Sequence, residues 1–207
     1  DGEAAGDQSG YSVSLSSDGN TVAIGAGGNK ANGAGSGHVR VYNYNGTSWY
    51  QKGADIDGEA AGDYSGYSVS LSSDGKIIAI GAVANYGNGS RSGHTRIYNF
   101  NGISWVQLGA DIDGEAAGDQ SGYSVSLSSD GKIVAIGAFT NDGKSGDSGH
   151  VRVYQFSNDS WSQLGSDIDG EVANDYSGSS VSLSSDGTTL AIGAYGNDGN
   201  GVDSGHA

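Results

Sequence analysis

The chain has 207 residues, of which 39 are glycine and none is proline, cysteine or methionine, and its formal net charge is −15. Without cysteine it has no disulfides, thiolate zinc sites or cysteine nucleophiles. Binding to nucleic acid or to an anionic membrane needs Lys and Arg, and no apolar run reaches the roughly 18 residues of a membrane span. We therefore expect neither nucleic-acid binding nor membrane insertion. Because methionine is absent even at position 1, we expect a processed chain or a fragment.

One stretch of sequence organises the whole chain. Residues 9–26 return with a constant offset of 56 residues and without insertion or deletion, at 65–82, 121–138 and 177–194. The repeat units that follow are 1–56, 57–112, 113–168 and an incomplete fourth unit, 169–207. In tandem repeats of this length each unit must stack on its neighbours to bury a core. We therefore expect one domain, or a fragment of one.

Each complete unit is expected to contain four strands, described here for the first unit. Tyr11, Val13 and Leu15 alternate with serines, which is the period of a strand with one apolar face. Asp18-Gly19 predicts a hairpin turn, and the small residues of the return strand indicate close approach of backbones. The remaining expected elements are a return strand at 21–26, a loop at 27–37, strands at 38–44 and 49–56, and a connector at 57–63.

Four antiparallel strands in a unit of about 40–50 residues are typical of a β-propeller blade. A parallel β-helix is the alternative, but its coils are shorter and lack an outer strand with tryptophan. We predict an all-β fold, a β-propeller of four-stranded antiparallel blades in 56-residue tandem repeats. The incomplete fourth unit predicts an open edge at Val181–Leu183 and Leu190–Ala194, which other copies of the chain or the rest of a longer parent chain would cover.

The stretch Ser9-Gly-Tyr-Ser-Val13, followed by Ile24-Gly-Ala26, resembles the FG-GAP repeat of the integrin-α type, and the likeness extends over all four units. The resemblance implies a propeller used for binding or adhesion, outside the cell or on its surface. Two departures concern the proline after Gly-Ala, which is replaced in every unit, and the calcium hairpin of the family, which is shortened to Ser-Ser-Asp-Gly. A single Asp cannot supply the six or more oxygen ligands of Ca²⁺, so we do not expect that site.

The connectors carry clustered carboxylates, and their Asp-x-Asp-Gly-Glu spacing resembles part of a calcium loop. These carboxylates either bind Ca²⁺ or, as we prefer, cap turns and pair with arginines of the neighbouring blade. No other cofactor is expected. The candidate calcium ligands are Asp55, Asp57, Glu59, Asp63, Asp111, Asp113, Glu115, Asp119, Asp167, Asp169, Glu171 and Asp175.

Two further sets of residues recur in every complete unit. His38, Arg40 and Tyr42 share one strand face, as their equivalents do, and we expect them to form hydrogen bonds between blades because an active site is usually unique. Trp49 and its equivalents are expected to pack blades together, with stacking on sugars as the alternative. No Ser-His-Asp set, nucleophile elbow or phosphate loop stands out. We therefore do not expect an enzyme.

Differences between units concentrate in the loops that join the second and third strands. Loops that differ on a rigid scaffold commonly form binding surfaces, although unconstrained drift is an equal alternative. The candidate ligand-binding residues are Asn29, Lys30, Asn32, Asn85, Tyr86, Asn88, Arg91, Asn141, Asp142, Lys144, Asp147, Asn197, Asp198, Asn200 and Asp203. The predicted function is a non-enzymatic extracellular module for binding or adhesion, with a glycan or surface protein as ligand. The alternative is a structural subunit of an extracellular filament or sheath, assembled through open blade edges.

Overall fold

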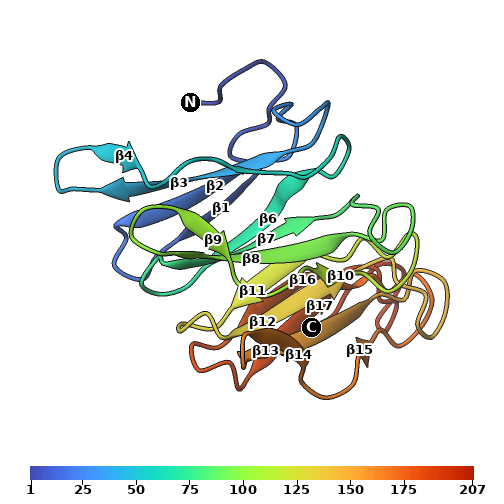
Figure 1. The fold of residues 1–207 in the computed structure, drawn as a ribbon. Coiled ribbons are helices and arrows are strands. Elements are labelled where there is room, and N and C mark those ends of the chain that lie inside the picture. Colours follow the sequence, from blue (N-terminus) through green and yellow to red (C-terminus); the bar gives the residue numbers. More distant parts are fainter.

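The computed structural model describes all of residues 1–207 and consists of β-strands, turns and loops (Figure 1). The first sheet pairs its strands antiparallel in the order β1 (Ser12–Leu15), β2 (Thr21–Ala26), β3 (His38–Tyr44) and β4 (Trp49–Gln51). β5 (Ile56–Asp57) pairs with β3 beyond the end of β4. The strand expected at 49–56 therefore forms in two pieces, interrupted at residues 52–55.

The next two sheets repeat this arrangement, and the all-β fold of four-stranded antiparallel sheets is confirmed. The second sheet comprises β6 (Ser65–Leu71), β7 (Ile77–Ala82), β8 (His94–Phe100), β9 (Trp105–Gln107) and β10 (Ile112–Asp113). The third comprises β11 (Ser124–Leu127), β12 (Ile133–Ala138), β13 (His150–Ser157), β14 (Ser160–Gln163) and β15 (Ile168–Asp169). The fourth pairs β16 (Ser177–Leu183) with β17 (Leu190–Ala194). No helix in the structure has the length and apolarity that a membrane span requires.

The β1–β2 hairpin closes through its own polar side chains. Asp18 Oδ1 accepts hydrogen bonds from Ser16 Oγ (2.6 Å) and from the Asn20 backbone N–H (2.9 Å). Asp18 Oδ2 accepts a further bond from the Asn20 amide. These hydrogen bonds, of which the one from Ser16 has the largest effect, lower the pKa of Asp18 to about 2. Both carboxylate oxygens are thus used within the turn.

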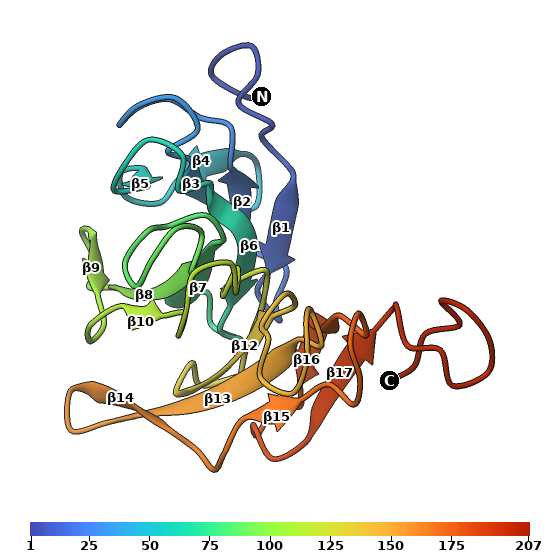
Figure 2. The same cartoon turned by 90° about the vertical axis from the view of Figure 1, so that its right-hand side faces the viewer.

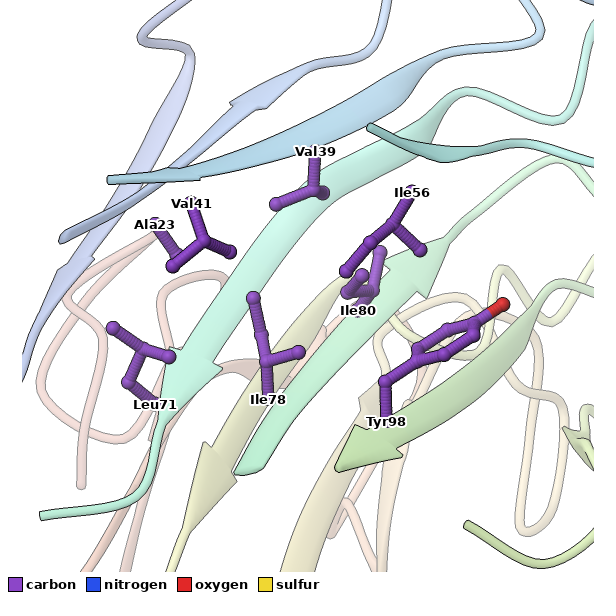
Figure 3. Close-up of a cluster of buried hydrophobic side chains, with 8 residues drawn as sticks. All are labelled: Ala23, Val39, Val41, Ile56, Leu71, Ile78, Ile80 and Tyr98. Carbon is purple, nitrogen blue, oxygen red and sulfur yellow. The ribbon is translucent and has the colours of Figure 1, made fainter. Parts of the chain in front are cut away.

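The hydrophobic cores lie between neighbouring sheets rather than within one sheet (Figure 3). Between the first two sheets, Val39 and Val41 of β3 pack in the same cluster as Ile78 and Ile80 of β7. A second cluster joins the second sheet to the third in the same way. Complete burial of such a side chain is worth about 1.5–3 kcal/mol. Each repeat therefore depends on its neighbour for stability.

The serines that alternate with apolar residues in the inner strands connect adjacent sheets. Ser14 Oγ accepts a hydrogen bond from the Leu71 backbone N–H at 2.9 Å, and the next two inner strands repeat this bond. Close approach of backbones accompanies it, because a Cβ on Gly25 would lie 2.1 Å from the carbonyl oxygen of Gly66. The small residues of the return strand are explained by this approach.

The sheets follow one another in chain order, with the first and fourth at the two ends of the series (Figures 1 and 2). The end position changes the exposure of equivalent residues in the inner strands. Leu71 and Leu127 are 8% and 7% exposed, whereas Leu15 in β1 is 58% exposed. The outer face of β1 therefore lacks the covering sheet that its equivalents have.

Candidate binding rim and carboxylate–histidine clusters

The loops that differ between units leave the same end of their sheets. In the first unit the loop at 27–37 runs from the end of β2 to the start of β3. β1 runs antiparallel to β2, so Tyr11, immediately before β1, lies at this end as well. We call this end the rim. It consists of the loops 27–37, 83–93, 139–149 and 195–205 together with the residues that lead into the inner strands.

A continuous row of six aromatic rings crosses the rim through all four units. Successive ring centroids lie 4.0–5.9 Å apart, and the members of this aromatic row are Tyr11, Tyr67, Tyr123, Phe139, Tyr176 and Tyr195. None of the six is buried, and the two terminal rings are each 55% exposed. Partial burial, followed by the neighbouring Tyr11 and Tyr123 hydroxyls, raises the pKa of Tyr67. The row was not identified as a site from the sequence.

The structure divides the candidate rim residues into two groups. Six asparagines hold the loops in place. Asn29, for example, is buried and its side-chain oxygen accepts a hydrogen bond from the Ala31 N–H, while Asn32 donates to the carbonyl of Gly58 in the connector. The corresponding asparagines are Asn85, Asn88, Asn141 and Asn197. Asn32 and Asn88 are nonetheless exposed, and so, fully or partly, are the other candidates: Lys30, Tyr86, Arg91, Asp142, Lys144, Asp147, Asp198, Asn200 and Asp203.

Several rim residues adopt a backbone conformation that favours glycine. The last differing position of the loop is Gly35 in the first unit, but Arg91, Asp147 and Asp203 occupy it in the others, with φ between 52° and 56°. Left-handed backbone costs most residues other than glycine roughly 1–2 kcal/mol, and Asn and Asp adopt it more readily than the others.

A second feature recurs once in every complete unit, as three clusters of one histidine and two carboxylates. In each, one atom per residue lies within 4.8 Å of the other two. In the first, His38 Nδ1 lies 3.8 Å from Glu3 Oε2 and 3.6 Å from Asp55 Oδ2. We call these sets the carboxylate–histidine clusters: Glu3, His38 and Asp55; Glu59, His94 and Asp111; Glu115, His150 and Asp167.

An arginine beside each cluster connects neighbouring sheets. Arg96 of β8 donates a hydrogen bond at 2.8 Å to the carbonyl of Asp57, which belongs to β5 of the preceding sheet. Its other terminal nitrogen lies 3.3 Å from Glu59 Oε1. This agrees with the expected role of the His-Arg-Tyr strand face between blades. Burial, followed by the charge of the adjacent arginine, lowers the pKa of His94 and His150.

The tryptophans of the outer strands also reach the preceding sheet. Trp105 Nε1 donates to the carbonyl of Lys52, and Trp161 Nε1 to that of Leu108, both at 2.7 Å. Trp49, in the first sheet, is 47% exposed. The interpretation of these residues as packing residues is therefore favoured over sugar stacking.

The candidate calcium ligands of one connector do not converge on one point. Asp55 lies beside His38, whereas Glu59 belongs to the cluster of the next unit. Asp63 is buried and caps its own turn, because its Oδ2 accepts a hydrogen bond from the Ala60 N–H at 2.9 Å; Asp119 and Asp175 make the same kind of bond. Ca²⁺ takes oxygen ligands, so clusters that contain an imidazole nitrogen do not suit it.

Comparison with known proteins finds one matching family model and several proteins of similar structure. The model of the FG-GAP repeat matches residues 55–98 and 168–207. No curated protein matches the chain. A Bacteroides uniformis protein provisionally assigned as a 6-phosphogluconolactonase is similar in structure (TM-score 0.59, 12% identity, 87% of this chain and 46% of that one). Hydrazine synthase of Kuenenia stuttgartiensis is also similar (TM-score 0.57, 17% identity, 89% of this chain and 49% of that one). So is Sqt1 of Saccharomyces cerevisiae (TM-score 0.51, 14% identity, 82% of this chain and 37% of that one).

At these identities the likeness shows the fold alone, which in the matched structures is propeller-like. The chain spans less than half the length of each of them.

Proposed function

The chain contains FG-GAP repeats, and from this premise we propose that it is part of a β-propeller that binds an extended glycan on its rim and catalyses no reaction. The side-by-side sheets with their inner strands in contact support the propeller. So do the matched structures, which are propeller-like and about twice as long as the chain or longer. Such a scaffold keeps all its rim loops on one face.

The aromatic row is the observation that carries the choice of a glycan. The six rings, with successive centroids 4.0–5.9 Å apart, form a partly exposed aromatic row across four units, and the tyrosines among them carry hydroxyls at the ring edges. Sugar rings have apolar faces and polar edges, and tyrosine has the same combination of a flat apolar body and a polar tip. The rim loops also carry exposed carboxylates, amides and amines that can bind sugar hydroxyls.

A glycan array with matched variants tests this proposal. The double variant Tyr11→Ala with Tyr195→Ala removes the two most exposed rings of the row, whereas Tyr50→Ala removes a ring of similar exposure on β4. We expect at least a tenfold loss of affinity in the double variant, equivalent to about 1.4 kcal/mol, and no change in the control. Binding that survives the double variant, or binding confined to protein ligands, would reject the glycan assignment.

The absence of catalysis is supported by the repetition of every polar cluster in each complete unit. An active site is usually a single constellation, and the carboxylate–histidine clusters occur three times. The names of two matched structures describe enzymes, but those activities belong to those proteins. Turnover that copurifies with the chain and disappears on substitution of one cluster would contradict the proposal.

We place the module outside the cell or on its surface. The FG-GAP match and the acidic, cysteine-free composition support this location. Protease treatment of intact cells that express the parent protein provides the test. Degradation of the chain without lysis is expected, and full protection of the chain in intact cells would contradict the location.

A structural subunit of a filament or sheath is the second candidate, favoured by the uncovered outer face of β1. Val13 and Leu15 are exposed there, whereas the equivalent leucines of the next two units are buried. A second copy stacked on this face would cover it, and a contact of this head-to-tail kind propagates into fibres unless it closes a ring. Light scattering on a sizing column, with electron microscopy, separates discrete particles of one or two chains from long polymers.

A further inference from the structure

Two buried polar atoms at the first carboxylate–histidine cluster have no hydrogen-bond partner. They are Nδ1 of His38, a residue that is 1% exposed, and Oδ1 of Asp57. The pairing of β3 with β5 sets Asp57 opposite His38, so both atoms belong to one locality. A buried polar atom without a partner costs about 1–3 kcal/mol. Two of them on directly paired residues, one of which belongs to the cluster, indicate a ligand at this cluster.

The carboxylates of each cluster are held in place through one oxygen and present the other to the imidazole. Arg96 lies 3.3 Å from Glu59 Oε1, while Glu59 Oε2 faces His94 Nδ1. Gln107 donates a hydrogen bond to Asp111 Oδ1, while Asp111 Oδ2 faces the same nitrogen. The other two clusters have equivalent partners. Partners that orient ligands in this way are typical of metal sites.

The spacing within the clusters suits a small divalent ion. His94 Nδ1 lies 3.6 Å from Asp111 Oδ2 and 4.0 Å from both Glu59 Oε2 and Asp113 Oδ1. These separations exceed hydrogen-bond length. Metal–ligand bonds of about 2.0–2.2 Å at tetrahedral angles separate ligand atoms by about 3.3–3.6 Å, so contractions of a few tenths of an ångström would close the site.

The charge of the cluster matches a divalent ion. In the second unit the three carboxylates of Glu59, Asp111 and Asp113 face one guanidinium, that of Arg96, and a buried imidazole. The formal sum is −2 when the imidazole is neutral, and neutral imidazole is the form that ligates metals. Mixed nitrogen and carboxylate ligands suit zinc and similar ions, whereas Ca²⁺ and Mg²⁺ prefer oxygen alone.

We propose that each of the three carboxylate–histidine clusters binds one divalent transition-metal ion of the zinc class, through histidine Nδ1 and its facing carboxylate oxygens. The bound ion connects the connector, which supplies the glutamate, to the strand that begins with the histidine. The fourth unit of this chain supplies Glu171 and His206 but no equivalent of Asp55. The expected stoichiometry is therefore three ions per chain.

Zinc titration of the chelator-treated chain, followed by calorimetry and elemental analysis after desalting, tests the proposal. We expect three zinc ions per chain, two in Asp111→Asn and three in the control Asp186→Asn, which alters an exposed carboxylate in the β16–β17 turn. His94→Gln is the second variant for the same site and is also expected to retain two. Circular dichroism verifies the fold of each variant.

Spectra with Co²⁺ identify the ligands. Visible absorption of the intensity typical of four-coordinate Co²⁺, reduced by one third in Asp111→Asn, would support the assignment. Fewer than one zinc ion per folded chain, three ions retained in both site variants, or Ca²⁺ that binds with the same stoichiometry and displaces zinc would each overturn it.

Discussion

Truncation of one leucine position in successive repeats measures how far each unit depends on the one beside it. Leu15, Leu71 and Leu127 occupy the same place in the inner strand, but only the last two are buried, at 8% and 7% exposure against 58%. Leucine to alanine removes three carbon groups, worth about 0.8 kcal/mol each when buried. For Leu71 the transfer contribution is therefore about 2 kcal/mol, and the cavity left behind raises the expected cost to about 2–5 kcal/mol. For Leu15 the same estimate gives about 1 kcal/mol.

Urea unfolding of the three alanine variants, with fluorescence and circular dichroism as coincident probes, provides the free energies of unfolding. The expected order is a large and similar loss for Leu71→Ala and Leu127→Ala and a small loss for Leu15→Ala. An equal loss at all three positions would refute the claim that the outer face of β1 is uncovered. It would instead indicate that another copy of the chain covers this face in solution.

Three further substitutions test contacts between repeats and within a turn. Gly81→Ala should lower the free energy of unfolding by about 3 kcal/mol, because the added Cβ would lie 2.0 Å from a carbonyl oxygen of the next repeat. Gly193→Ala should lower it much less, because its Cβ would meet only the flexible side chain of a serine. Thermal unfolding compares the two variants. Trp105→Phe should lower the free energy of unfolding by about 1–2 kcal/mol, because it removes the hydrogen bond from the indole to the preceding sheet. Trp49→Phe should change it little, because Trp49 is largely exposed. Chemical denaturation measures both. The pKa of Asp130 lies below 3.8, chiefly because its carboxylate accepts a hydrogen bond from the side chain of Ser128. The ionised Asp130 therefore stabilises the fold above the unfolded-state pKa, and this contribution disappears as pH falls through the folded-state pKa. Urea midpoints measured from pH 6 down to about pH 3 should therefore fall less steeply for Asp130→Asn than for the parent chain, and identical slopes would contradict this.

The strands and turns could be predicted from the sequence because their signals are local. Alternation around Val13 and Val69, and the Asp-Gly pairs that follow, act within a few residues and return in each unit. The interruption between β4 and β5 could not be predicted, since it depends on how the outer strand follows β3. The serines that alternate with Val13 and Leu15 predict a small polar face. Their hydrogen bonds to the next sheet could not be predicted, because these bonds depend on the spacing between sheets.

The candidate site was harder to predict because its residues come from separate parts of the repeat. Asp55 and Glu59 are close in the sequence, but the connector crosses from one sheet to the next between them, so they enter different clusters. The aromatic row combines three different repeat positions, represented by Tyr67, Phe139 and Tyr176. The recurrence of tyrosine at 11, 67 and 123 was the one sequence signal that could have indicated it. The remaining members are visible only once the rim is assembled in space.

Oxidative footprinting of the chain with and without the tightest glycan from the array tests the central claim most directly. Hydroxyl radicals modify exposed tyrosines, and mass spectrometry locates the modification. The account predicts that the bound glycan protects Tyr11 and Tyr195 at the ends of the aromatic row and leaves Tyr50 on β4 unchanged. Protection of Tyr50 together with unchanged oxidation of the row would contradict a glycan-binding rim.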